Sequence, residues 1–221
     1  MNFKIKICGL KTEEVIEAAI EAGADMIGLN FHPKSPRYVA PEAAAGLAAI
    51  ARARTEVVAL VVDAGPGQLN VLSANVSPDI WQLHGLETPT RCGEIKSWRR
   101  RPVMKALGVA GPADLAAVAA YAPIADFILL DAKPPKDAAY PGGHGRPFDW
   151  NVLSTLPPDQ PFMLSGGLSP ENVGEAIRTV RGMGLTLFGV DVSTGVESAP
   201  GVKDPGKIKA FVAAAREAGG S

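Results

Sequence analysis

The sequence predicts an α/β fold, a single-domain (β/α)8 TIM barrel that occupies residues 1–221. Short β-rich segments alternate with amphipathic helical segments in about eight units, and 221 residues approach the roughly 250 that are typical of such barrels. Several predicted strands, such as residues 56–62 (EVVALVV), are apolar throughout, as in a parallel sheet covered by helices. No linker or break in composition divides the chain, so we expect one domain.

The predicted strands are short and carry strand periodicity or a continuous apolar run. Residues 3–7 (FKIKI) alternate polar and apolar side chains, which is the period of a strand with one buried face. The same criteria predict strands at residues 25–31, 56–62, 79–83, 102–107, 126–131, 161–167 and 185–193.

Helical periodicity fills the segments between these strands. Thr12 is placed to cap the first helix, Gly23 to end it, and Pro41 stands in the first turn of the second helix, while Ser169 is a candidate cap near the end of the chain. The predicted helices are residues 12–23, 41–53, 66–75, 88–98, 111–122, 148–156, 169–182 and 204–218.

A doubly wound open sheet is the competing architecture. Such a sheet usually carries a GxGxxG pattern after its first strand, whereas residues 8–14 read CGLKTEE. The barrel is therefore the better interpretation.

The composition excludes several classes of protein. The 22 Lys and Arg against 23 Asp and Glu give a formal net charge of −1, which offers no general basic field for nucleic acid. Two cysteines are too few for a disulfide framework, and no Cys/His cluster indicates a metal site. The first strand contains lysines and no secretory signal is visible, and no apolar run approaches the ~18 residues of a membrane span. We expect a cytoplasmic protein that binds neither nucleic acid nor a membrane.

The barrel determines where a site is expected. Active sites of this fold lie at the carboxyl ends of the strands, so residues far apart in the sequence should converge at one mouth. The residues at or just beyond the predicted strand ends are Cys8, Asn30, Asp63, His84, Lys105, Asp131, Gly166 and Asp191.

The last two strand ends together predict a phosphate site. Gly166 and Gly167 follow one strand, and Ser193, Thr194 and Gly195 follow the next. Small residues let backbone N–H groups approach an anion, and barrels often hold phosphate at these two loops. For a lone GG pair, a simple tight turn is the competing interpretation.

Two strand-end residues are candidates for proton transfer. Cys8 points at the mouth, where a thiol with a lowered pKa serves as base or nucleophile, whereas Cys92 lies in a helical segment and is expected to be structural. Asp131 ends an apolar strand and either caps a turn or acts in catalysis. The irregular segment of about 18 residues after it is long for a compact domain, and we expect the glycines of its GGHG sequence to be hinges.

Two further polar residues have a place at the mouth. His84 is a third acid–base candidate or a polar group that closes the barrel, since no partner is visible in the sequence. Arg37 lies in a Pro-rich loop and suits a bidentate hold on a carboxylate, with a solvated surface arginine as the alternative. His32 and Lys34 carry no comparable argument.

Taken together, the motifs resemble a known family. KICGL, FHPKSPRYV, QLHG, LLD, GGHGRPFDW, LSGGLSPENV and GVDVSTGVES are similar to those of phosphoribosylanthranilate isomerase, over essentially the whole chain and in the same order. The resemblance implies a (β/α)8 barrel of tryptophan biosynthesis without metal or organic cofactor, which acts on a small phosphosugar. We expect a monomer or a homodimer.

The resemblance also implies roles for individual residues. Cys8 corresponds to the general base and Asp131 to the general acid of an Amadori rearrangement, in which N-(5-phosphoribosyl)anthranilate becomes 1-(2-carboxyphenylamino)-1-deoxyribulose 5-phosphate. Arg37 would lie near the anthranilate carboxylate and Asp191 near the sugar, while the role of His84 stays open. The GG and STG loops, Gly166, Gly167, Ser193, Thr194 and Gly195, would bind the phosphate.

Three alternatives remain. The histidine-pathway isomerase performs the same rearrangement, but it has an aspartate in place of Cys8 and phosphate motifs in both halves, whereas LVVDAGPG here is a poor anion site. A bifunctional isomerase is disfavoured for the same reasons. A non-catalytic phosphosugar-binding barrel would need the phosphate loops but not both Cys8 and Asp131.

Overall fold

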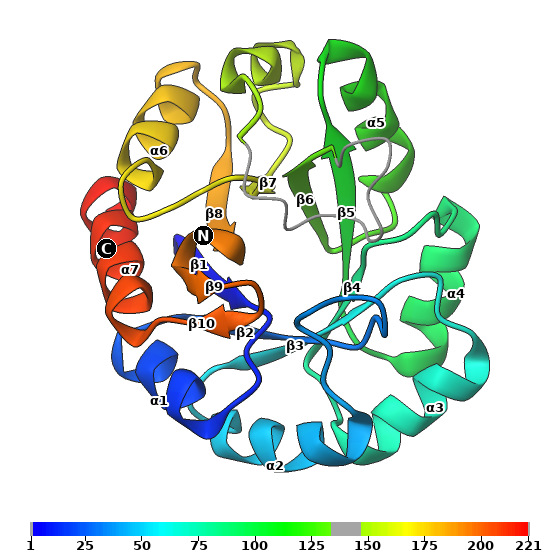
Figure 1. Cartoon of the computed structure of the whole chain (residues 1–221). Helices are drawn as coiled ribbons and strands as arrows, with labels where there is room; N and C mark the ends of the chain where they lie inside the picture. Colours follow the sequence, from blue (N-terminus) through cyan, green and yellow to red (C-terminus); the bar gives the residue numbers. More distant parts are fainter. Residues whose placement is uncertain (1, 134–146, 221) are drawn as a thin grey trace.

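The computed structural model describes residues 2–133 and 147–220, and it confirms the predicted barrel. Eight parallel strands pair in sequence order, and β8 closes the barrel against β1. Figure 1 shows the strands as an inner ring with the helices around them. The strands are β1 (Lys4–Cys8), β2 (Met26–Asn30), β3 (Glu56–Val61), β4 (Ile80–Leu83), β5 (Val103–Val109), β6 (Phe127–Ala132), β7 (Phe162–Leu164) and β8 (Leu187–Val192).

Helices follow the strands, as expected for this fold. The α-helices are α1 (Glu13–Glu21), α2 (Pro41–Ala51), α3 (Pro66–Asn75), α4 (Pro89–Arg99), α5 (Val118–Tyr121), α6 (Val173–Gly182) and α7 (Pro205–Gly219). Within the described residues, no helix is long and apolar enough to cross a membrane.

Two predicted α-helices are largely 3₁₀ helix instead. Residues 111–122 divide into η1 (Pro112–Ala117) and the short α5, and residues 148–156 contain η2 (Trp150–Thr155). The Asp114 carboxylate accepts from the backbone N–H groups of Ala110 and Gly111, at 2.8 and 3.2 Å, which holds the start of η1 as a tight turn. Proline follows both segments in the sequence, and the residue before a proline disfavours helical geometry, so neither segment extends into a long α-helix.

The predicted helix starts are partly right. The Thr12 hydroxyl caps α1 by accepting from the Val15 N–H at 3.5 Å, and Pro41 is the first residue of α2. Ser169 is not the cap of α6, because that helix begins only at Val173 with Asn172 as its N-cap residue. The Asn172 side chain instead folds back, accepting from the Ser169 N–H and donating to the Gly167 carbonyl.

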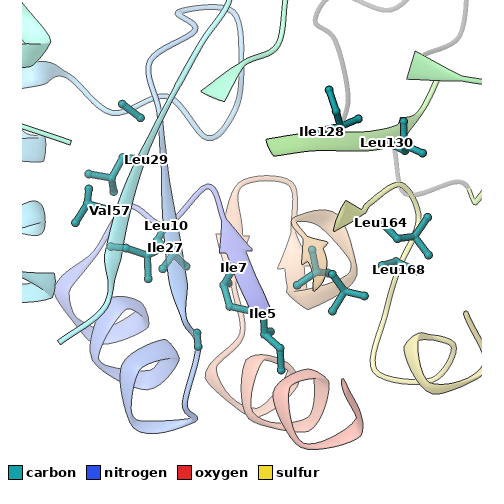
Figure 2. Close-up of a cluster of buried hydrophobic side chains, with 14 of the residues drawn as sticks. Ile5, Ile7, Leu10, Ile27, Leu29, Val57, Ile128, Leu130, Leu164 and Leu168 are labelled. Atoms are coloured by element: carbon teal, nitrogen blue, oxygen red, sulfur yellow. The ribbon is translucent and has the colours of Figure 1, made fainter. Parts of the chain in front are cut away.

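The alternation of side chains along each strand divides the core into two clusters. Outward-facing residues such as Ile5 and Ile7 pack in the larger cluster, between the sheet and the helices, and Figure 2 shows part of it. The inner cluster fills the lower barrel and consists of Met26, Val58, Ile80, Met104, Ala106, Leu129, Met163 and Phe188. In β1, the inward face therefore carries Lys4, Lys6 and Cys8.

A small antiparallel hairpin follows β8 and was not predicted. It consists of β9 (Glu197–Ala199) and β10 (Val202–Lys203), after the 3₁₀ helix η3 (Thr194–Val196). Glu197 and Lys203 are both buried, so this hairpin brings two charged side chains into the upper barrel.

Candidate active site

The predicted convergence at the mouth of the barrel is confirmed for most of the strand-end residues. A cleft at the carboxyl ends of the strands is lined by Cys8, Asn30, His32, Ser35, Arg37, Leu60, Val62, Gln82, His84, Asp131, Ser165, Gly166, Gly167, Leu168, Asp191, Val192, Ser193, Thr194 and Gly195. Every candidate binding or catalytic residue from the sequence lies in this lining.

Two strand-end residues do not reach the cleft. Lys105 lies within β5, which continues to Val109, and its side chain forms a buried ion pair with Glu87 at 2.8 Å. Asp63 lies beyond β3, and its carboxylate accepts from the Leu86 N–H at 2.7 Å. Side chains alternate between the inside and the outside of the barrel along each strand, and both residues fall at outward positions. They therefore stabilise the loop after β4 instead of facing the mouth.

Cys8 is buried at the end of β1, against a glycine of the neighbouring strand. A Cβ atom at Gly28 would lie 2.8 Å from the Cys8 Sγ, so the glycine leaves the space that the thiol occupies. Burial raises the pKa of Cys8 above its ordinary value and outweighs the nearby cations Lys6 and Lys203, which lower it.

Below Cys8, buried polar groups join β1, β8 and the residue that follows β7. The Lys6 ammonium donates to the Asp191 Oδ1 at 2.7 Å, and the Ser165 hydroxyl donates to the Asp191 Oδ2 at 2.9 Å. Burial opposes the charge of Lys6, but Asp191 and then Cys8 outweigh it, so the pKa of Lys6 is raised. The pair with Asp191 therefore favours the charged form of Lys6 inside the barrel.

Asp131 stands on β6, next to the histidine of the QLHG motif. The His84 Nε2 lies 3.3 Å from the Asp131 Oδ2, and the Ala132 N–H donates to Oδ1 at 2.9 Å. On the other side of the ring, the Gln82 amide nitrogen lies 3.1 Å from the His84 Nδ1. This gives His84 the partner that the sequence could not show, and it fixes the position of the Asp131 carboxyl.

Arg37 is not a solvated surface residue. Its guanidinium makes a bidentate pair with the buried Glu197, at 2.7 Å from Nε and 3.0 Å from Nη2, and Nη2 also donates to the Thr194 hydroxyl at 3.0 Å. Lys203 completes the cluster by donating to Glu197 at 2.8 Å and to the Ser193 carbonyl at 2.8 Å. The cationic groups of Arg37 and Lys203 thus both pair with the Glu197 carboxylate, beside the loop after β8.

The two predicted phosphate loops lie against each other. Gly166 has a φ of +86°, and a side chain there would collide with the backbone of Ala132. A Cβ at Gly195 would collide with the Leu168 carbonyl, so this glycine permits the close approach of the loops after β7 and β8. Their glycines therefore do more than make tight turns, because they bring two segments of backbone to one side of the cleft.

Sequence reasoning missed several residues around the cleft. Lys6 and Gln82 stand two positions before Cys8 and His84, so strand periodicity alone could have placed them on the same inner face. Glu197 and Lys203 gave no such signal, because they reach the site only through the unpredicted hairpin.

Comparison with known proteins agrees with this geometry. Residues 5–214 match the family described as N-(5'phosphoribosyl)anthranilate (PRA) isomerase. An N-(5'-phosphoribosyl)anthranilate isomerase of Azorhizobium caulinodans is 52% identical over 218 residues, 99% of this chain and 93% of that protein. The chain belongs to the PRA isomerase family.

Solved structures of PRA isomerases share the fold over nearly their full length. The crystal structure of the enzyme from Thermotoga maritima superimposes with a TM-score of 0.85 at 38% identity, covering 97% of this chain and 99% of that one. A PRA isomerase in complex with reduced 1-(o-carboxyphenylamino)-1-deoxyribulose 5-phosphate superimposes with a TM-score of 0.81 at 34% identity, with the same coverage.

Two further expectations from the sequence concern a metal site and a hinge. In the part of the chain that the structure describes, no group of three His, Cys, Asp or Glu side chains is arranged to hold a metal ion. The GGHG sequence at 142–145, where we expect hinge glycines, lies outside the described residues.

Proposed function

We propose that this isomerase converts N-(5-phosphoribosyl)anthranilate into 1-(2-carboxyphenylamino)-1-deoxyribulose 5-phosphate in tryptophan biosynthesis, with Cys8 as general base and Asp131 as general acid. The observation that carries the proposal is the placement of Cys8 on β1 and Asp131 on β6 in one cleft, together with the two glycine loops. We further infer that it works in the cytoplasm without a cofactor, as a monomer or a homodimer.

The glycine loops are proposed to anchor the substrate by its phosphate. Gly166 and Gly167 on one side and Ser193, Thr194 and Gly195 on the other would offer backbone N–H groups to the phosphate oxygens. The guanidinium of Arg37 and the ammonium of Lys203 lie beside the second loop, where each would attract an anion electrostatically. Holding the sugar at this end fixes its ring between the acid and the base.

The rearrangement then needs two proton transfers. Protonated Asp131 would donate to the furanose ring oxygen, so that the C1–O bond breaks and the anthranilate nitrogen forms a Schiff base with C1. The Cys8 thiolate would remove the proton from C2, which leaves an enolamine that tautomerises to the ketone. His84 and the Ala132 N–H would hold the Asp131 carboxyl in position for the first of these steps.

The remaining polar groups have proposed places around the substrate. Arg37 would contact the anthranilate carboxylate, and Asp191 would lie close to the sugar. The Arg37 side chain would contact the carboxylate from a fixed position, because its guanidinium also donates to Glu197 and to the Thr194 hydroxyl.

A turnover assay with both candidate substrates tests the proposal. Anthranilate fluorescence would follow N-(5-phosphoribosyl)anthranilate, and the substrate of the histidine-pathway isomerase would be assayed in parallel. Turnover of the first alone is the expected result. Turnover of the second alone, or binding of phosphosugar without turnover of either, would overturn the proposal.

A further inference from the structure

A lysine is an unexpected residue inside a barrel. Such interiors are filled mainly by branched apolar side chains, yet the Lys6 side chain is fully buried there and pairs with Asp191. Buried ion pairs are often no more stabilising than apolar residues of similar volume. Fold stability therefore does not explain this pair, and a chemical task is the better explanation.

The surroundings of Lys6 direct its charge toward the cleft. Lys6 and Cys8 share the inward face of β1, and Lys6 is paired in register with Asp191 on β8. Both oxygens of the Asp191 carboxylate are occupied, Oδ1 by Lys6 and Oδ2 by the Ser165 hydroxyl. The ammonium is thus held in place one layer below the thiol.

We propose that Lys6 is the positioning residue that stabilises the Cys8 thiolate, with Asp191 and Ser165 fixing its ammonium. This inference rests on the proposed role of Cys8 as the base. Lys6 is not in the lining of the cleft, so it acts on the substrate only through Cys8.

The electrostatic reason is the burial of the thiol. Removing a thiolate from water strongly favours its neutral form, and a nearby cation favours the anion. Within the described residues, the charged groups that act on Cys8 are Lys6 from β1, Asp191 from β8 and Lys203 from β10, while Gly28 of β2, which packs against the thiol, carries no charge. Lys6 and Lys203 lower the pKa of Cys8 and Asp191 raises it.

The proton balance of the reaction agrees with this role. Cys8 takes the proton from C2 of the sugar and becomes a neutral thiol. Lys6 keeps its proton throughout, because the ion pair with Asp191 stabilises its charged form. Its positive charge therefore lowers the free energy needed to ionise Cys8, while Lys6 itself neither gives up nor accepts a proton.

The test measures how fast iodoacetamide alkylates Cys8 as a function of pH, since only the thiolate reacts. Cys92→Ala serves as the background, so that Cys8 is the sole thiol. In Lys6→Met, alkylation near pH 8 should be at least about tenfold slower, and the titration midpoint should move upward. Turnover should fall through kcat, with recovery toward higher pH.

Two matched variants separate a charge effect from a general structural effect. Lys4→Met removes the other lysine on the inward face of β1, which is partly exposed and pairs with Glu56, and it should leave the midpoint unchanged. Asp191→Asn removes the opposing carboxylate and should move the midpoint downward. A disrupted barrel would instead change Lys6→Met and Asp191→Asn in the same direction.

The double variant Lys6→Met/Asp191→Asn covers the case in which an unpaired buried carboxylate prevents folding. Its midpoint should lie above that of Asp191→Asn alone. Equal midpoints in these two variants, or an unchanged midpoint in Lys6→Met, would overturn the inference. Failure of the proposed function has a different signature, because Cys8→Ala would then retain turnover while the alkylation midpoints still differ.

Discussion

The His84 Nε2 faces the Asp131 Oδ2 at 3.3 Å, while the opposite ring nitrogen lies 3.1 Å from the Gln82 amide. The imidazole is therefore held at both ring nitrogens, and it orients the carboxyl within the cleft. We expect His84→Phe to lower kcat about tenfold, the effect of losing one hydrogen bond to the reacting group, with little change in KM. Steady-state kinetics measures both, and a loss as large as that of Asp131→Asn would make His84 the proton donor.

Asp131→Asn tests the acid itself. Asparagine keeps the shape of the side chain and can hydrogen-bond the ring oxygen, but it cannot transfer a proton to it. General acid catalysis contributes about 10²–10⁴-fold, so kcat should fall by at least that range with KM little changed. Thermal unfolding and binding of a product analogue serve as controls. A folded variant that binds the analogue and keeps more than about a tenth of kcat would remove Asp131 from this role.

Arg37→Ala separates substrate binding from structure. Loss of a charge-assisted contact to the anthranilate carboxylate should cost about 1.5–3 kcal/mol, mostly in kcat/KM. The variant should also unfold more easily, because the buried Glu197 keeps only Lys203 as its charged partner in the cluster described above. A substrate analogue without the carboxylate is the control, and an equal loss with that analogue would show that Arg37 acts only through Glu197 and the loop.

The barrel and most of the cleft could be predicted because each depends on local patterns. Alternation along the strands placed Cys8 and Asp131 at the mouth, and the glycines marked the two loops. The Arg37–Glu197 pair could not be predicted, because it joins segments 160 residues apart through a hairpin without a strong sequence pattern. The prediction that Lys105 lies at the mouth was wrong because β5 continues beyond it to Val109. Neighbouring positions of a strand point to opposite faces, so a residue one position out of register lies outside the barrel instead of inside it.

Lys203 gives the protein a specific pH dependence. Burial lowers the pKa of Lys203 from 10.5 to about 8, although Glu197 acts in the opposite direction. At a pH between about 8 and 10.5, Lys203 is therefore mainly protonated in the unfolded chain and mainly neutral in the folded chain. The contribution of this residue to the free energy of unfolding therefore increases as the pH rises.

The measurement compares wild type with Lys203→Met by denaturant unfolding at pH 7 and at pH 10. The free energy of unfolding of wild type relative to the variant should increase by roughly 2–3 kcal/mol between them. Lys209→Met removes an exposed lysine of α7 and should show no such trend. A relative stability that decreases over this range would mean that Lys203 stays charged in the folded protein.

Gly28→Ala tests whether the position of the Cys8 thiol limits the reaction. The added Cβ would lie 2.8 Å from Sγ and 3.0 Å from the Cys8 Cα, so the thiol has to move away from β2. A displacement of about 1 Å at a reacting group costs on the order of 10²-fold in rate, and we expect that loss in kcat. KM should change little, because the phosphate loops follow β7 and β8 on the other side of β1.

Gly46→Ala is the matched control, since a Cβ there meets nothing within 4 Å, and the free energy of unfolding should increase by about 0.5–1 kcal/mol because alanine favours the helix. Wild-type kcat in a folded Gly28→Ala protein would mean that the reaction does not depend on where this strand holds the thiol.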